Sequence, residues 1–180
     1  MSWGLMAPNA PSKIQEPAAI AVAAVSKSGL PAGSTATIDK NFSFYRLPDN
    51  TSGSAAIPIV LNPQPVAHLV VKKNAYSVVL IRASVGWRTT DAGNGKDRIA
   101  IAFAIWRDSP LTGTLVCSVQ DSCAVGDSYR ATSFEHIDLG FSEVTGAAEI
   151  TYTLSAQQLT QTESAAEISG CLTFTALVME

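Results

Sequence analysis

Charged residues are scarce in this 180-residue chain. Lys, Arg, Asp and Glu together make up 15% of it, against about 25% in an average soluble domain. With 12 basic and 15 acidic residues, the formal net charge is -3, so the chain has no overall positive field that would attract polyanions. This excludes a conventional, strongly basic nucleic-acid binder. Together with the 47% hydrophobic content, it favours a surface that associates with other copies.

Cysteine is also rare, and its spacing excludes two common uses. Cys117, Cys123 and Cys171 form an odd set without a Cys-x-x-Cys pair or a neighbouring His cluster, so neither a disulfide framework nor a zinc site is expected. Acidic residues at Asp91 and Asp121 lack the ligand spacing of a calcium loop. We therefore expect no metal, no cofactor and a reducing, intracellular setting.

Long apolar runs are absent, and the first 40 residues are rich in Pro, Gly, Ser and Ala. The apolar stretch Ala18–Val25 is much shorter than the roughly 20 residues that span a membrane, and no basic region precedes it as in a signal peptide. We expect a soluble protein whose residues 1–40 form an extended N-terminal arm. Because Ala18–Val25 is too apolar for water, we expect it to lie against a neighbour or the domain's own sheet.

The remaining residues, 41–180, consist of short runs rich in β-forming residues between turn-forming Pro, Gly, Asn and Asp. In the last run, Ile168, Leu172 and Phe174 share one face by period-two alternation, which predicts a half-buried, central closing strand. The strands expected are Asn41–Leu47, Ala56–Leu61, Ala67–Val71, Tyr76–Trp87, Arg98–Trp106, Thr114–Val119, Thr132–Leu139, Ala148–Leu154 and Glu167–Val178.

This pattern predicts an all-β domain, an antiparallel eight-stranded jelly-roll β-sandwich, because the jelly roll is the commonest architecture for that strand count. Asn94-Gly95 supplies the positive φ angles of a tight turn, so Tyr76–Trp87 and Arg98–Trp106 are expected to pair antiparallel. Helical periodicity is weak, and only Ser155–Glu163 could form a helical turn or two.

Residues that could carry chemistry do not form a recognisable motif. Ser133, His136 and Asp138 could suggest a catalytic triad, but no Gly-x-Ser-x-Gly elbow is present, and strand neighbours do not meet in triad geometry. Gly93–Lys96 lacks the full phosphate-loop pattern and is better read as a hairpin turn. We expect that the protein is not an enzyme.

One small group combines basic and aromatic residues. Lys72, Lys73 and Arg82 lie near Tyr76 in sequence, and such side chains could contact phosphates with a salt-dependent contribution to affinity. The simpler interpretation is a charged loop before a strand. Both interpretations remain open from the sequence.

Several segments, taken in order, resemble tymovirus-like plant virus coat proteins. The closing segment Ala166–Leu172 contains the Ile-Ser-Gly step of that family's last strand, and Ile101–Pro110 is similar to its central strand with the following Ser-Pro turn. The first half is represented by Phe42–Phe44, Ala55–Leu61, Pro65–Leu69 and Tyr76–Ala83. The region between Val119 and Ala148 departs from the family, so a more distant jelly-roll capsid is the alternative within this class.

The resemblance implies a jelly-roll capsid protein that self-assembles into an icosahedral shell and packages a positive-strand RNA genome. It implies a location in the virion and in the cytoplasm of the infected cell. With a net-negative subunit, polyamines or metal cations would offset the RNA charge, and direct RNA contacts would be few. The family's use of histidine near the inner surface makes His68 and His136 candidates beside Lys72, Lys73 and Arg82.

A binding module of another class is the competing hypothesis. A trimeric jelly roll of the tumour-necrosis-factor or C1q type could serve as a lectin or fibre head. Its sugar-stacking aromatic residues would be Trp87, Trp106 and Tyr129. A compact trimer that binds glycans would distinguish it from a shell-forming subunit.

Overall fold

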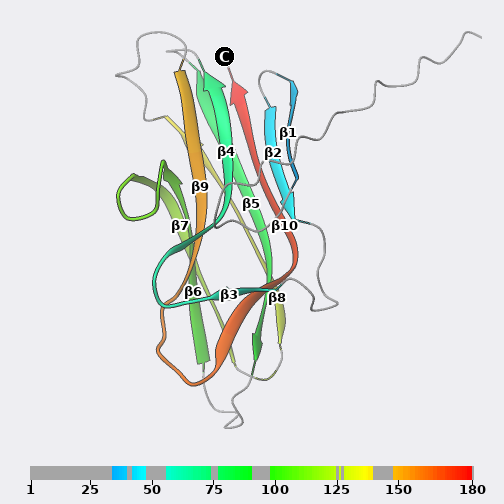
Figure 1. Ribbon diagram of the computed structural model, residues 1–180, viewed down its shortest axis with the longest axis vertical. Coiled ribbons are helices and arrows are strands. Elements are labelled where there is room, and N and C mark those ends of the chain that lie inside the picture. Colours follow the sequence, from blue (N-terminus) through cyan, green and yellow to red (C-terminus); the bar gives the residue numbers. More distant parts are fainter. Residues whose placement is uncertain are drawn as a thin grey trace, which may run out of the picture.

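The computed structural model describes residues 34–39, 42–47, 56–73, 77–90, 98–124, 126, 128–139 and 148–179. Within these residues the protein is all-β with antiparallel pairing, and none of them is helical. No helix there could cross a membrane. Figure 1 shows the strands arranged as two layers.

The first layer, sheet A, has its strands in the order β1-β2-β10-β5-β8, and β3 also pairs with β10. The second layer, sheet B, has the order β4-β9-β6-β7. Sheet A consists of β1 (Ser34–Asp39), β2 (Phe42–Leu47), β3 (Ile57–Ile59), β5 (Val78–Thr90), β8 (Tyr129–Asp138) and β10 (Ala165–Met179). Sheet B consists of β4 (Gln64–Lys73), β6 (Arg98–Arg107), β7 (Thr114–Ala124) and β9 (Ala148–Gln158).

Eight of these strands pair in a nested way. Strand β2 pairs with β10, β4 with β9, β5 with β8, and β6 with β7, all antiparallel. Successive pairs in this series lie alternately in sheet A and sheet B. The chain is therefore paired as one long hairpin whose strand pairs are distributed between two packed sheets.

The core lies between the two sheets and is built by period-two alternation. On β5, Val79, Ile81 and Trp87 are fully buried, and on β6 Ile101 and Phe103 are fully buried. Full burial of side chains of this size contributes roughly 1.5–3 kcal/mol each. The faces expected from the sequence for these two strands are confirmed.

The expected pairing of these two strands is wrong. β5 pairs with β10 and β8 in sheet A, whereas β6 pairs with β7 and β9 in sheet B. Their apolar faces are buried in the same core, between the sheets. The alternation identifies the buried face of a strand but does not identify its hydrogen-bonded neighbour. Asn94-Gly95 lies outside the described residues.

Two other expectations also differ from the structure. The structure describes ten strands, where eight were expected. The suggested helical turns at Ser155–Glu163 are wrong, because β9 continues as a strand to Gln158 and the residues after it are not helical. Pairing of Gln158 with Ile101 of β6 extends the strand beyond the weak helical signal.

The closing strand β10 is central in sheet A, as expected. It lies between β2 and β5, and Leu172 and Phe174 are fully buried. Its register with β5 shifts between Ile168 and Leu172, where Gly170 has a φ of 120°, a conformation that favours glycine at a bulge. A Cβ atom on Gly86 of β5 would lie 3.2 Å from the Ser169 carbonyl oxygen, so a larger residue there would press on the backbone of the bulge.

Most of the expected arm, residues 1–33, lies outside the described residues. Strand β1 falls within the range expected to form the arm, and it extends sheet A by pairing with β2. The division of the chain into an arm of residues 1–40 and a domain of residues 41–180 stays a prediction.

Candidate functional site

A buried ionic cluster links the two sheets at one end of β8. The Asp138 carboxylate on β8 accepts hydrogen bonds from Arg107 of β6, with Nε at 2.9 Å and Nη2 at 2.6 Å. The Tyr152 hydroxyl of β9 donates to the same carboxylate at 2.8 Å. Asp138 is 3% exposed and Tyr152 is fully buried. We call Arg107, Asp138 and Tyr152 the Asp138 cluster.

Burial dominates the electrostatics around this cluster. Loss of solvation is the main effect on Lys73, and it lowers the pKa of this residue. The charge of Asp138 acts to raise the same pKa, and the charge of Arg107 acts to lower it. Burial, assisted by the charge of Asp138, raises the pKa of Cys117 to about 11 and that of Tyr152 well above its ordinary value. The thiol of Cys117 and the hydroxyl of Tyr152 thus stay protonated at neutral pH. These properties fit a structural tie between sheets.

A second polar cluster links the sheets toward the other end of β8. The Trp87 indole Nε1 donates to the Thr132 hydroxyl at 2.9 Å, and this hydroxyl donates to Asp121 of β7 at 2.7 Å. Arg130 donates to the other oxygen of Asp121 at 3.1 Å. We call Trp87, Thr132, Asp121 and Arg130 the Thr132 cluster. It is more exposed, since the Arg130 side chain is 43% accessible.

The basic residues expected to contact RNA do not gather in one place. Lys72 points outward from sheet B and pairs with Glu149 at 3.2 Å, whereas Lys73 points inward and is 2% exposed. Arg82 lies on the outer face of sheet A, paired with Glu135 at 2.6 Å. The alternation of β4 already separates Lys72 from Lys73. A compact basic cluster is therefore not formed, and single contacts with RNA remain a prediction.

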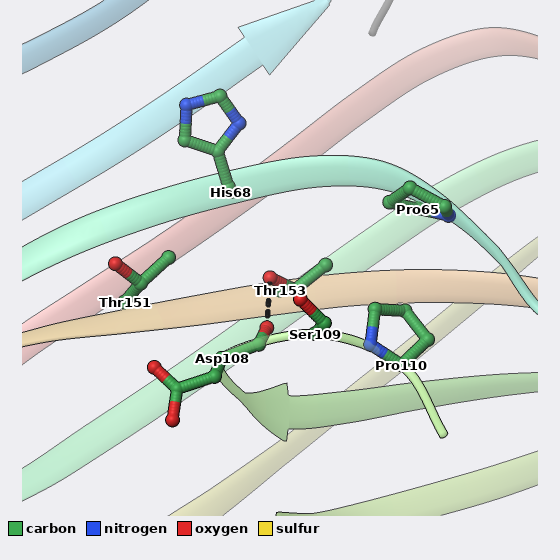
Figure 2. A pocket seen from close by; sticks show the side chains of 7 residues that line it. All are labelled: Pro65, His68, Asp108, Ser109, Pro110, Thr151 and Thr153. Carbon is green, nitrogen blue, oxygen red and sulfur yellow. Dashed lines mark hydrogen bonds between the residues drawn. The ribbon is translucent and has the colours of Figure 1, made fainter. Parts of the chain in front are cut away.

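The two histidines also lie apart, in different sheets. His68 of β4 lines a groove of about 300 Å³ on the outer side of sheet B, drawn in Figure 2. Thr153 of β9 donates to the Asp108 carbonyl oxygen in this groove. Its other lining residues are Pro65, Ser109, Pro110 and Thr151. Its lining combines hydroxyl, imidazole and carboxylate side chains with two prolines.

The second histidine, His136, is exposed on β8 opposite Ile81 of β5. Ser133 lies on the other face of β8, where its hydroxyl is hydrogen-bonded to Ser84, and Asp138 is held by Arg107 and Tyr152. A Ser133–His136–Asp138 triad is therefore not assembled. In the described part of the chain, His, Cys, Asp and Glu do not form a group of three that could hold a metal.

The aromatic residues suggested for sugar stacking have other roles. Trp87 is fully buried in the core. The Trp106 indole donates to Ser155 at 2.9 Å. Tyr129 is exposed, but the Arg88 guanidinium lies 5.7 Å from the centre of its ring. Trp87 is therefore not accessible for sugar stacking, because the inward face of β5 takes it into the core.

Sequence reasoning missed both polar clusters. Asp138 drew attention only as a member of a triad, and Arg107 only as part of a turn. Their ion pair joins residues 31 positions apart, which no local pattern encodes. One signal was available: Thr132, Phe134 and Asp138 share the inward face of β8, so a charged residue there requires a partner.

Comparisons with known proteins give fold likenesses only. No protein-family model and no curated protein matches the chain. Among solved structures, the chain is similar to a chain in the structure of infectious bursal disease virus Gx strain. The TM-score is 0.42 and the identity 11%, over 87% of this chain and 42% of that one. It is also similar to a chain in the structure of the Gt strain, with a TM-score of 0.37 and 12% identity over 94% of this chain and 43% of that one. A third structure, described as "CBM4 structure and function", has a TM-score of 0.26 and 6% identity over 82% of this chain and 78% of that one.

The chain spans less than half of the length of the two virus chains it matches. All three TM-scores lie below 0.5, so none of these likenesses assigns a function to this chain.

Proposed function

We propose that this chain is a viral coat protein of the tymovirus-like kind. Its role is structural, without catalysis: many copies assemble into an icosahedral shell around a positive-strand RNA genome. It is a component of the virion and is made in the cytoplasm of the infected cell.

The observation that carries this proposal is the nested strand pairing. Setting β1 and β3 aside, the eight remaining strands pair first with last, second with seventh, third with sixth and fourth with fifth, alternating between the sheets. This order supports assignment as an eight-stranded jelly roll, an architecture used by viral capsid domains and lectins. The low charge and the sequence resemblance favour the capsid over the lectin.

The charges support a shell that makes few direct contacts with RNA. At least five basic side chains in the described segments are paired with carboxylates: Lys72, Arg82, Arg88, Arg107 and Arg130. A cation already held by a carboxylate adds little counterion release on binding a phosphate. With a net charge of -3, the packaged RNA would need polyamines or metal cations for neutralisation.

Imaging of the expressed full-length chain tests the proposal. We expect closed shells in negative-stain electron microscopy and large particles in light scattering, with nuclease-protected RNA and co-purifying polyamines inside. A chain that stays monomeric or trimeric across pH and salt, without shells, would contradict it. A compact trimer that binds glycans on an array would instead establish the binding-module hypothesis.

A further inference from the structure

The outer face of sheet A carries a row of apolar side chains that crosses four strands. Leu80 of β5 is directly opposite Leu177 of β10 and Ile137 of β8, and Leu177 is opposite Phe42 of β2. Directly opposed residues of antiparallel strands lie on one face, about 4.5–5.5 Å apart. Since Val79 and Ile81 point into the core, this row points away from it.

Two members of the row are exposed, and the other two, Leu80 and Phe42, are half-buried. Ile137 is 48% exposed and Leu177 is 38% exposed, and Leu139, just beyond β8, is 72% exposed. Single exposed apolar residues are normal, but apolar residues that are contiguous on one sheet face are typical of an interaction surface. Its residues come from strands far apart in the sequence and are united only by the fold.

The neighbouring row on the same face is charged. Arg82 of β5 is opposite Glu135 of β8, and the two side chains form an ion pair at 2.6 Å while 63% and 58% accessible. Such an exposed pair adds little to the stability of a single chain. Beyond it, Ser84 of β5 is opposite Ser133 of β8. Strand β5 thus carries the cation and the edge strand β8 carries the anion.

This arrangement is complementary to itself. A two-fold axis parallel to the strands, between β5 and β8, would place β5 of one copy over β8 of the other. Because such an axis keeps positions along the strand direction, the apolar row would lie over the apolar row and the charged row over the charged row. Leu80 then faces Ile137 of the second copy, and Arg82 faces Glu135 of the second copy. An isologous contact requires such self-complementarity, and the sheets would pack face to face at about 10 Å.

We propose that the outer face of sheet A, over β5 and β8, is an isologous interface with a second copy of this chain. Leu80 and Ile137, the members of the apolar row on these two strands, supply burial, and the four charges from two copies set the register. The proposal rests on the proposed function in requiring self-association, and it names the surface that performs it.

Substitution on the two outer faces tests the surface. In the full-length chain, Ile137→Asp should raise the dissociation constant of the dimer at least about tenfold in sedimentation velocity. Val70→Asp is the matched control, since Val70 is 43% exposed on the outer face of sheet B. It should leave association unchanged, and both variants should keep the wild-type circular dichroism. Equal effects of the two variants, or none of Ile137→Asp, would overturn the proposal.

Mixing two charge-reversal variants tests the register. Arg82→Glu makes all four charges at the contact negative and Glu135→Arg makes all four positive, so each variant alone should dimerise more weakly. Their mixture should form a heterodimer, because one copy then presents two cations to two anions. A role of Arg82 and Glu135 within one chain only would give no heterodimer, and this would overturn the register.

Three further results distinguish this interface from the alternative occupant and from the proposed capsid function. If the chain's own residues 1–33 cover this face, deleting them would create association where the full-length chain shows none, and the proposal would be overturned. If Ile137→Asp still forms shells, the capsid function stands and this interface fails. If the wild type dimerises through this face but forms no shells, the interface stands and the capsid function fails.

Discussion

The Asp138 cluster and the Thr132 cluster join the same two sheets in different environments. Both link strand β8 of sheet A to sheet B, and Thr132 and Asp138 lie six residues apart on β8, or about 20 Å. The Asp138 carboxylate is 4% accessible, whereas the Asp121 carboxylate is 20% accessible. The same type of link should thus cost much more to break at the buried end, because an ion left without its partner there cannot regain water.

Removing the buried carboxylate should have the largest effect. Asp138→Ala leaves the Arg107 guanidinium and the Tyr152 hydroxyl without their acceptor, and we expect a loss of about 3–5 kcal/mol in the free energy of unfolding. Urea denaturation followed by circular dichroism measures it. Glu149→Ala, which removes the exposed ion pair with Lys72 on sheet B, is the control and should cost no more than about 1 kcal/mol. Equal losses in the two variants would show that the Asp138 cluster does not tie the sheets.

The hydroxyl of Tyr152 should matter less, and in a way that depends on pH. Tyr152→Phe removes a hydrogen bond to a carboxylate, at a cost of about 1.5–3 kcal/mol near pH 8. Burial raises the pKa of Tyr152 above its ordinary 10.0, so above pH 10 the unfolded chain releases a proton that the folded chain keeps. Wild-type stability therefore falls as pH rises, and the penalty of Tyr152→Phe should shrink by pH 11.

Comparison with the variant isolates Tyr152 from its neighbours. Burial lowers the pKa of Lys73 from its ordinary 10.5, so this residue makes wild-type stability rise with pH below 10.5, opposite to the effect of Tyr152. Cys117, whose pKa is raised to about 11, titrates in the same pH range. Both groups are present in the wild type and in Tyr152→Phe, so their contributions largely cancel in the difference. A penalty that is constant from pH 8 to pH 11 would contradict the prediction.

The hydrogen bonds of Thr132 should be cheaper still to break, because the Asp121 carboxylate that accepts one of them is 20% accessible and regains water. Thr132→Val keeps the side-chain shape but removes both the acceptor of the buried Trp87 indole N–H and the donor to the Asp121 carboxylate, at a cost of about 1–2 kcal/mol. Thr173→Val, outward-facing on β10, is the matched control. Thermal unfolding of the two variants would measure the difference, and equal melting temperatures would show that Trp87 finds another acceptor.

The sequence predicts the elements of this fold better than their connections. Period-two alternation identifies the buried faces of β5, β6 and β10, because burial on one side of a strand is a local property. It misplaces the partner of β5, because pairing depends on the whole chain. The clusters combine both kinds of information: the inward position of Asp138 follows from alternation, whereas the choice of Arg107 and Tyr152 as partners depends on how two sheets meet. The apolar row from Phe42 to Ile137 is likewise visible only after the register is known.

The smallest effect on stability is expected at the partly exposed Asp121 carboxylate, and it should depend on pH in the acid range. Burial acts to raise the pKa of Asp121, but hydrogen bonds from Thr132 and the Ser122 N–H, with the charge of Arg130, lower it overall from its ordinary 3.8. Its contribution to stability is therefore present above pH 3.8 and is lost as pH falls below that value, because the unfolded chain takes up the proton first.

Asp121→Asn should consequently cost no more than about 1 kcal/mol at pH 7, since the group is partly solvated, and less at about pH 3, where the unfolded wild-type chain has already taken up most of the proton. Urea denaturation at the two pH values measures this difference. A penalty at pH 7 as large as that of Asp138→Ala would remove the contrast between the two ends of β8, because burial would then not decide how strongly each cluster holds the sheets together.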